Sequence, residues 1–163
     1  PSKIHDEHLA YTRESGQDFY FPSTNYKLSQ SELRKIKQHF STISDISGLQ
    51  LISFSYEETK YGWLRTKDVD IYANYRNRLS VFKIQDFYAV VEYYLLYEFE
   101  KSKAMLAYIQ WMFPIEEDDV DVKIFKRLEA YAFINVSAID HCIGFIEIGN
   151  LFYIVDKEVD NEQ

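Results

Sequence analysis

The chain is poor in the residues that make covalent cross-links and sharp turns. Its 163 residues include one cysteine, three prolines and five glycines. The single cysteine, Cys142, excludes an internal disulfide framework and fits a reducing compartment. The glycines are scattered and form neither a dinucleotide-binding motif nor a P-loop, so no phosphate-cradling loop is expected.

Long apolar stretches are also absent. The longest candidate, Phe87–Phe99, is interrupted by Glu92 and Glu98, whereas a membrane span needs about 18 apolar residues. No basic segment followed by an apolar one marks a secretory signal. We expect no membrane-spanning segment, and the start at Pro1 rather than Met predicts a domain cut from a longer protein.

The net charge of -8 is unevenly distributed along the chain. Residues 27–83 carry ten Lys and Arg against six Asp and Glu, whereas residues 84–163 carry six against sixteen. An acidic chain is a poor general phosphate binder, because affinity for DNA comes mostly from neutralising phosphates. The first half therefore offers either a local basic face or an ordinary charged surface.

Aromatic residues are abundant, at 17% of the chain, with 14 tyrosines and 12 phenylalanines. They are densest from Phe87 to Phe113, where aromatic and β-branched residues fill two segments separated by the polar residues Glu100–Lys103. This composition is typical of strands, and the polar interruption predicts a hairpin.

One amphipathic helix is predicted at 29–43. Ser29 and Glu32 have the spacing of a capping box, in which each side chain accepts a hydrogen bond from the other residue's backbone N–H. Apolar residues then recur at spacings of three and four and form one stripe: Leu33, Ile36, Phe40 and Ile43.

Short strands are expected through the rest of the chain, at 49–56, 61–66, 69–75, 78–84, 131–136, 143–148 and 152–155, with Gly149-Asn150 as a tight turn. The pattern offers no crossover helices, which argues against a parallel α/β fold. The expected fold is mainly β, a small barrel or a curled antiparallel sheet with one N-terminal amphipathic helix. We expect residues 1–27 to form an extended polar arm, 28–157 a single domain and 158–163 a frayed tail.

No combination of residues predicts an active site. Asp140-His141-Cys142 invites comparison with a Cys–His nucleophile, but neighbouring residues of a strand point to opposite faces. His5 and His8 have ligand-like spacing without a Cys nearby, and the acidic run at 116–121 lacks the spaced ligands and central Gly of an EF-hand. We therefore predict that the chain is not an enzyme and holds no metal ion and no cofactor.

Aromatic side chains on the predicted strands allow two interpretations. Most such residues belong to the core or to cross-strand pairs. A cluster at a barrel rim would instead form a cage for a methylated lysine, or a stacking surface for single-stranded bases. Trp111 and Phe113 are the strongest candidates for exposure, because they lie at a strand end just before Pro114.

Three segments resemble parts of the bromo-adjacent homology (BAH) domain. Val90–Tyr94 and Leu106–Pro114 are similar to its opening strands, and Ala132–Asp140 is similar to a later portion. Residues Gly144–Asp156 would then supply the closing strands. The resemblance implies a BAH-like small β-barrel, a nuclear protein, and recognition of a protein or a histone tail.

Much of the chain also resembles the C-terminal region of transposon-encoded proteins found in fungal genomes. The matching segments are Met105–Trp111, MLAYIQW, and Phe133–Asp140, FINVSAID, with Tyr61–Arg65 similar to an upstream strand. Glycines that are usual near Ala89 and Lys101 in that family are missing here. Because that region is separate from the family's acidic nuclease, the resemblance implies no cleavage activity.

We expect a non-catalytic interaction module of a nuclear, chromatin- or transposon-related protein. Its partner would be a basic protein or peptide such as a histone tail, bound by an aromatic strand end and an acidic loop: Trp111, Phe113, Glu116, Glu117, Asp118 and Asp119. One alternative is DNA binding through the 27–83 half, with these residues on phosphates: Arg34, Lys35, Lys37, Arg65, Lys67, Arg76 and Arg78. Another is an oligomerisation scaffold whose exposed edge strands pair with another chain.

Overall fold

The computed structural model describes residues 9–13, 17–43, 57–66, 69–72, 81–84, 87–99, 102–117 and 122–154. Within these ranges the chain forms eleven strands, the α-helix α2 (Gln30–Ile43) and the 3-10 turn η2 (Val136–Ala138). The strands are β1 (Leu9–Arg13), β2 (Gln17–Lys27), β3 (Glu57–Thr66), β4 (Val69–Tyr72), β5 (Val81–Ile84), β6 (Phe87–Phe99), β7 (Ser102–Glu117), β8 (Lys123–Asn135), β9 (His141–Ile143), β10 (Phe145–Ile148) and β11 (Leu151–Ile154).

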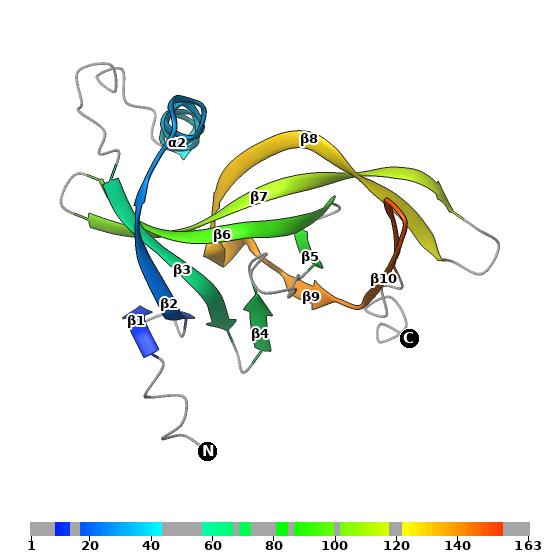
Figure 1. Ribbon diagram of the computed structural model, residues 1–163, viewed down its shortest axis with the longest axis horizontal. Coiled ribbons are helices and arrows are strands. Elements are labelled where there is room, and N and C mark those ends of the chain that lie inside the picture. The colour runs from blue at the N-terminus through cyan, green and yellow to red at the C-terminus, as the bar shows by residue number, and fades with distance from the viewer. Residues whose placement is uncertain are drawn as a thin grey trace.

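The described strands belong to one antiparallel sheet. Its main path runs β1-β2-β3-β6-β7-β8-β11-β10, with β4 beside β3 and with β5 joining β6 to β9. Figure 1 shows the long strands β6, β7 and β8 side by side across the molecule, with β1 and β2 toward one end and β10 toward the other. The prediction of a mainly β fold with a helix is confirmed.

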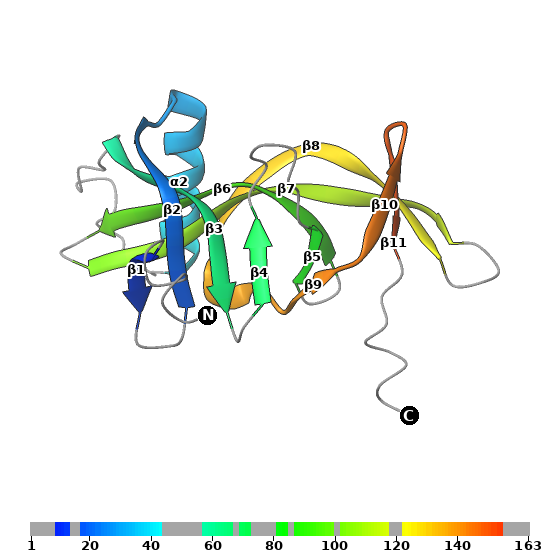
Figure 2. The ribbon, with the colours of Figure 1, turned by 60° about the horizontal axis from the view of Figure 1, so that its bottom comes forward.

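The sheet is curled and is not closed into a barrel (Figures 1 and 2). β3 pairs with Tyr94–Leu96, in the second half of β6. β11 pairs with Lys123–Lys126, the part of β8 that faces the far end of β7. The terminal strands β1 and β10 are thus attached to opposite ends of the long strands, where they cannot pair with each other. This confirms the curled sheet and corrects the alternative of a closed barrel.

The predicted hairpin of β6 and β7 lies at the centre of the sheet. The two strands pair up to Phe99 and Ser102, so the expected polar turn at 100–103 is shorter than predicted. β7 also continues beyond the expected end at Phe113. It runs through Pro114 to Glu117, with a register shift directly after the proline, which has no N–H to contribute to the ladder.

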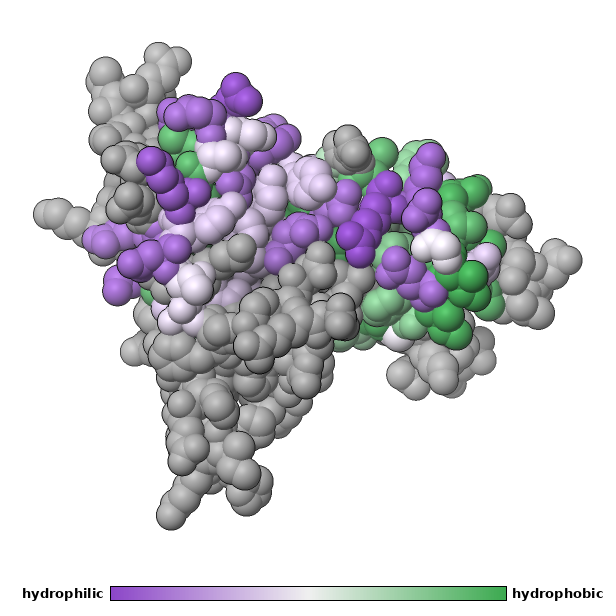
Figure 3. Space-filling view, viewed as in Figure 1, coloured by the Kyte–Doolittle hydropathy of each residue, from purple (hydrophilic) through white to green (hydrophobic). Residues whose placement is uncertain are grey.

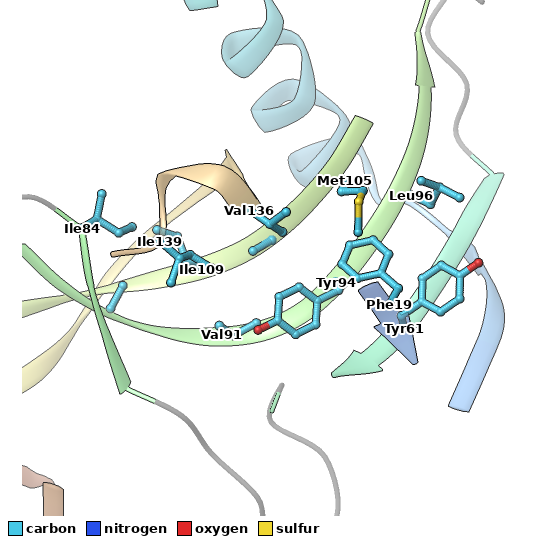
Figure 4. Packing of buried hydrophobic residues seen from close by; sticks show 12 residues of the cluster. Phe19, Tyr61, Ile84, Val91, Tyr94, Leu96, Met105, Ile109, Val136 and Ile139 are labelled. Carbon is cyan, nitrogen blue, oxygen red and sulfur yellow. The ribbon is translucent and has the colours of Figure 1, made fainter. Parts of the chain in front are cut away.

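The two faces of the sheet carry different parts of the core, because alternate strand residues point to opposite faces. On β7, Met105, Ala107 and Ile109 belong to a buried cluster that also contains Phe19 and Tyr61, shown in Figure 4. On the same strand, Leu106 and Met112 face the other way, into two further clusters. We call the side of Met105 the first face and the opposite side the second face.

Helix α2 packs on one end of the second face (Figure 1). Ile36 and Phe40 are buried there, as the predicted apolar stripe requires, and Leu33 is partly buried. The predicted capping box is present. The Ser29 N–H donates to Glu32 Oε1 at 2.9 Å, and the Glu32 N–H donates to Ser29 Oγ at 3.1 Å.

Residues 9–13 and 17–27 are strands of the sheet rather than an arm outside the domain. β2 pairs with β3 from Gln17 to Lys27. Phe19 is 0% exposed, and its ring centroid lies 5.1 Å from that of Tyr61. The described domain therefore begins before residue 28. The polar residues on either side of the aromatic residues 19–21 concealed this strand in the sequence.

The other strand predictions vary in accuracy at their boundaries. β8 begins at Lys123 rather than at 131, because basic side chains interrupt its apolar pattern. The predicted tight turn is present: Ile148 pairs with Leu151, and Gly149 has a φ of 63°. The predicted strand at 49–56 and the tail at 158–163 lie outside the described residues.

Candidate interaction surface

The structure separates the residues predicted to bind a partner. Trp111 is half-buried against the first core cluster, whereas Phe113 is 49% exposed. Glu116 and Glu117 form the last residues of β7, so they continue a strand instead of beginning a loop. Asp118 and Asp119 lie outside the described residues.

Phe113 belongs to a mostly apolar row of paired residues that crosses four strands and includes Lys126. It pairs with Lys126 of β8, which pairs with Leu151 of β11, which pairs with Ile148 of β10. Residues directly opposite each other in an antiparallel pair project to the same face. Phe113 lies on the first face, since it follows Ile109 and Trp111 at even spacing on β7. The whole row therefore projects from the first face.

A second row runs beside the first and has the same orientation. Ile124 of β8 pairs with Tyr153 of β11, which pairs with Ile146 of β10. We call the apolar residues of these two rows the apolar face: Phe113, Ile124, Ile146, Ile148, Leu151 and Tyr153. The rows also contain two charged residues, Lys126 and Glu116, which pairs with Ile124. Ile146 and Ile148 are 64% and 61% exposed. Figure 3 shows apolar surface gathered at the end of the molecule where β7, β8 and β10 lie.

The opposite side of β7, β8 and β11 is core, whereas β10 carries the partly buried Phe145 and the exposed Glu147 there. Met112, Phe125, Phe152 and Ile154 are at most 5% exposed there and form one buried cluster. β7, β8 and β11 therefore carry apolar residues on both sides here, although only one side is covered. Two-sided apolar strands are usual in sheets that are covered on both faces.

Basic side chains are present on both sides of this part of the sheet. On the apolar face, Lys126 Nζ lies 5.9 Å from the centroid of the Phe113 ring. On the second face, Arg127 lies over Phe152 and Lys123 over Tyr88, at 5.4 Å and 5.8 Å from the ring centroids. An acidic residue, Glu147, lies between Ile146 and Ile148 on β10 and is also exposed.

A buried carboxylate marks a second, more polar cluster beside α2. Glu32 is 8% exposed and accepts hydrogen bonds from the hydroxyls of Tyr26 and Tyr93, in addition to the Ser29 N–H. Burial alone would raise the pKa of Glu32, but the bonds from Tyr93, Ser29 and Tyr26 outweigh it and hold that pKa below its ordinary value. The pKa of Tyr26 is raised to about 12, mainly by burial and secondly by the neighbouring Glu32 carboxylate.

The tyrosines near Glu32 stack in series. The ring centroids of Tyr93 and Tyr108 are 5.0 Å apart, and those of Tyr108 and Tyr131 are 5.4 Å apart and nearly parallel. Tyr108 also packs on Phe133 at 4.6 Å. These rings pack against one another as cross-strand pairs, in agreement with the core interpretation of the strand aromatics.

The Asp140-His141-Cys142 segment does not form a Cys–His pair. His141 and Cys142 are neighbours in β9, opposite Lys83 and Phe82 of β5, so their side chains point to opposite faces. Cys142 packs against the first core cluster. Within the described part of the chain, no group of three or more His, Cys, Asp or Glu residues is placed to hold a metal ion.

Of the basic residues of the nucleic-acid alternative, those whose side chains the structure describes all lie on α2. Arg34 and Lys37 are exposed on α2, and Lys35 is half-buried. Arg65 lies in β3, whereas Lys67, Arg76 and Arg78 lie outside the described residues. No helix among the described residues is long and apolar enough to cross a membrane.

Sequence reasoning identified Phe113 but missed its neighbours on the apolar face. Ile146 and Ile148 alternate with Phe145 and Glu147, which is enough to place both isoleucines on one side of a strand. This alternation does not tell which side of the strand is covered by other parts of the protein. Their exposure depends on β8 and β11, whose other side packs against distant parts of the chain.

Comparison with known proteins finds no matching protein-family model, no similar curated protein and no similar solved structure.

Proposed function

We propose that this chain is a non-catalytic protein-interaction module that binds a basic protein segment through the apolar face. The observation that carries the proposal is the exposure of Phe113, Ile146 and Ile148 on one face of the sheet, beside strands β8 and β11, whose other side belongs to the core. Contiguous exposed apolar surface rimmed by polar residues is typical of protein-binding sites.

The energetics favour a partner on this face. Fully burying one large apolar side chain contributes about 1.5–3 kcal/mol. Phe113 is suited to act as an anchor, since aromatic residues are enriched at the centres of interfaces. Lys126 lies between Phe113 and Leu151 in the row, and its long side chain can keep the charged end hydrated beside the Phe113 ring.

Charge favours a basic partner. Residues 84–163 carry ten more acidic than basic side chains. Five of those acids fall within residues 116–121, directly after Phe113 and Ile115 along the chain. Complementary charge speeds association and suppresses wrong partners. A segment with both apolar and basic residues, such as a histone tail, fits this combination.

The finer assignment, a BAH-like module of a nuclear chromatin- or transposon-related protein, belongs to the same proposal. Its support is the sequence resemblance, together with the position of the two best-matching segments. MLAYIQW lies in β7, and FINVSAID begins in β8; the two pair with each other from Leu106↔Asn135 to Tyr108↔Phe133. Segments that carry a shared motif are thereby neighbours in the sheet.

An NMR titration with a histone-tail peptide, and separately with a short DNA duplex, tests the proposal at two salt concentrations. We expect the peptide to shift the amide signals of β7, β8, β10 and β11. Phe113→Ser should weaken peptide binding by about tenfold, because truncating an interface anchor costs more than 1 kcal/mol.

The matched contrast is the double variant Arg34→Ser/Lys37→Ser on α2, which should leave peptide binding unchanged. If DNA alone binds, with a salt-dependent affinity that this double variant weakens, the basic alternative replaces our proposal. If neither ligand shifts any signal and the molecular mass rises with protein concentration, the oligomerisation scaffold is favoured.

A further inference from the structure

Strand β10 lies at the free end of the described strand order. It pairs with β11 on one side, and no other described strand pairs with its outer side. Figure 2 shows the β10–β11 hairpin standing at the end of the molecule. An exposed edge strand presents a row of backbone donors and acceptors to which another chain can add.

The hairpin register indicates which backbone groups face outward. Ile148 and Leu151 flank the two-residue turn, and Ile146 pairs with Tyr153 two residues further on. In an antiparallel ladder, hydrogen-bonded and non-hydrogen-bonded pairs alternate, and the pair that closes a two-residue turn is hydrogen-bonded. Ile146 and Ile148 thus direct their N–H and C=O groups toward β11. Phe145 and Glu147 direct theirs toward the open edge.

The side chains of β10 show a clear pattern of polarity. Ile146 and Ile148 project from the apolar face, 64% and 61% exposed. Glu147 projects from the second face, opposite Phe152 of β11, and is also exposed. A strand placed beside β10 would therefore meet two apolar side chains on one face and a carboxylate on the other.

Strand β10 of a second copy is a poor occupant of that edge. Paired residues of a continuous sheet must project to the same face. Glu147 of one copy would thus meet Glu147, Phe145 or Gly149 of the other. The first pairing sets like charges directly opposite each other, which is destabilising, and the other two leave the carboxylate without a cation. A basic side chain opposite Glu147 supplies the missing complement.

We propose that an extended partner segment of alternating apolar and basic residues binds as an additional strand along β10. Its backbone bonds to the outward groups of Phe145 and Glu147. Its apolar side chains extend the apolar face beside Ile146 and Ile148, and a basic side chain lies opposite Glu147. This inference rests on the proposed function and specifies how the basic segment is held.

Amide hydrogen exchange distinguishes strand addition from binding by side chains alone. The probe is a short acetylated and amidated peptide in which valine and lysine alternate. On saturation, the Phe145 and Glu147 amides should become protected at least about tenfold, while those of Ile146 and Ile148, already bonded to β11, should change little. A peptide of the same composition with its lysines and valines in separate blocks should not produce this alternation.

Charge reversal at Glu147 tests the side-chain part of the proposal. Glu147→Lys should lower the affinity for the valine–lysine peptide by about tenfold. It should also allow a valine–glutamate peptide to bind, as expected for a directly opposed charge pair. The matched control is Glu98→Lys, an exposed carboxylate on β6 that faces Lys103, away from β10. This variant should not change the preference between the two peptides.

The outcomes separate this inference from the function on which it rests. If the peptides shift the signals of Phe113 but leave the Phe145 and Glu147 amides unprotected, strand addition is wrong and binding through the apolar face stands. If neither the histone-tail peptide nor the valine–lysine peptide binds, both proposals fail. If the Glu147→Lys and Glu98→Lys variants weaken binding equally, the effect comes from net charge and the β10 register is wrong.

Discussion

At the scale of single residues, Glu32 connects three parts of the chain. Its backbone N–H and carboxylate complete the capping box of α2, and the same carboxylate accepts hydrogen bonds from Tyr26 of β2 and Tyr93 of β6. A carboxylate this buried costs free energy unless it is fully hydrogen-bonded. Its partners satisfy that requirement, so the charge at Glu32 stabilises the contact between helix and sheet.

The first prediction concerns the pH dependence of Glu32→Gln. Because folding lowers the pKa of Glu32, its carboxylate contributes stability above the ordinary value of 4.5, and this contribution is lost as pH falls through the folded-state pKa. The variant should be less stable than the parent by about 1.5–3 kcal/mol at neutral pH, the usual range for hydrogen bonds to a charged group. The difference should shrink below the ordinary pKa.

Urea unfolding from neutral to acidic pH measures this difference. The control is Glu98→Gln, an exposed carboxylate on β6 for which a difference near zero is expected at neutral pH. Combining Glu32→Gln with Tyr93→Phe in a double-mutant cycle should give a smaller loss than the sum of the single variants. If the difference in unfolding free energy between Glu32→Gln and the parent stays constant down to acidic pH, the assigned role of the carboxylate charge is wrong.

At the scale of elements, the β10–β11 hairpin depends on its turn. Gly149 has a φ of 63°, in the left-handed region that residues with a Cβ rarely adopt. A Cβ at this position would meet no heavy atom within 4 Å. The need for glycine therefore comes from the backbone conformation and not from crowding.

The second prediction is that Gly149→Ala destabilises the protein by about 1–2 kcal/mol, the cost of the left-handed conformation for a residue with a Cβ. Gly149→Asn should cost less, since asparagine tolerates that region. Gly144→Ala is the matched control: its Cβ also has open space, but its φ is not positive, so no strain is expected. Thermal unfolding of the three variants measures the costs, and equal effects at the two glycines would contradict the turn assignment.

At the scale of the whole molecule, the sheet incorporates the N-terminal segment that its sequence suggested was an arm. Phe19 lies between strands far apart in sequence, with its ring 5.1 Å from Tyr61 and 5.5 Å from Tyr94. An arm outside the core would contribute little to stability. A strand that supplies a fully buried ring contributes as much as any other core element.

The third prediction is that Phe19→Ala lowers the free energy of unfolding by about 3–5 kcal/mol, the range for truncating a buried aromatic ring. Asn25→Ala, at an exposed position of the same strand, should change it by less than about 0.5 kcal/mol. Urea denaturation measures both. A change near zero for Phe19→Ala would restore the arm interpretation.

Local patterns were read correctly from the sequence. The Ser29–Glu32 capping box, the apolar stripe at Ile36 and Phe40, the central hairpin and the Gly149 turn depend on residues a few positions apart. In each case the favourable arrangement is fixed by hydrogen-bond geometry or backbone sterics within one or two turns of chain. Together, these local features were enough to predict a mainly β fold with one helix.

Only the tertiary structure decided which apolar surfaces are covered. The sequence places Ile146 and Ile148 on one side of a strand, and Phe19 in a short aromatic run within a polar segment. It does not show that the isoleucines are exposed and the phenylalanine is buried. Burial depends on pairing between distant strands: β2 with β3 covers Phe19, whereas β1 and β10, at opposite ends of the long strands, leave the sheet open. The open edge and the apolar face exist because the sheet does not close.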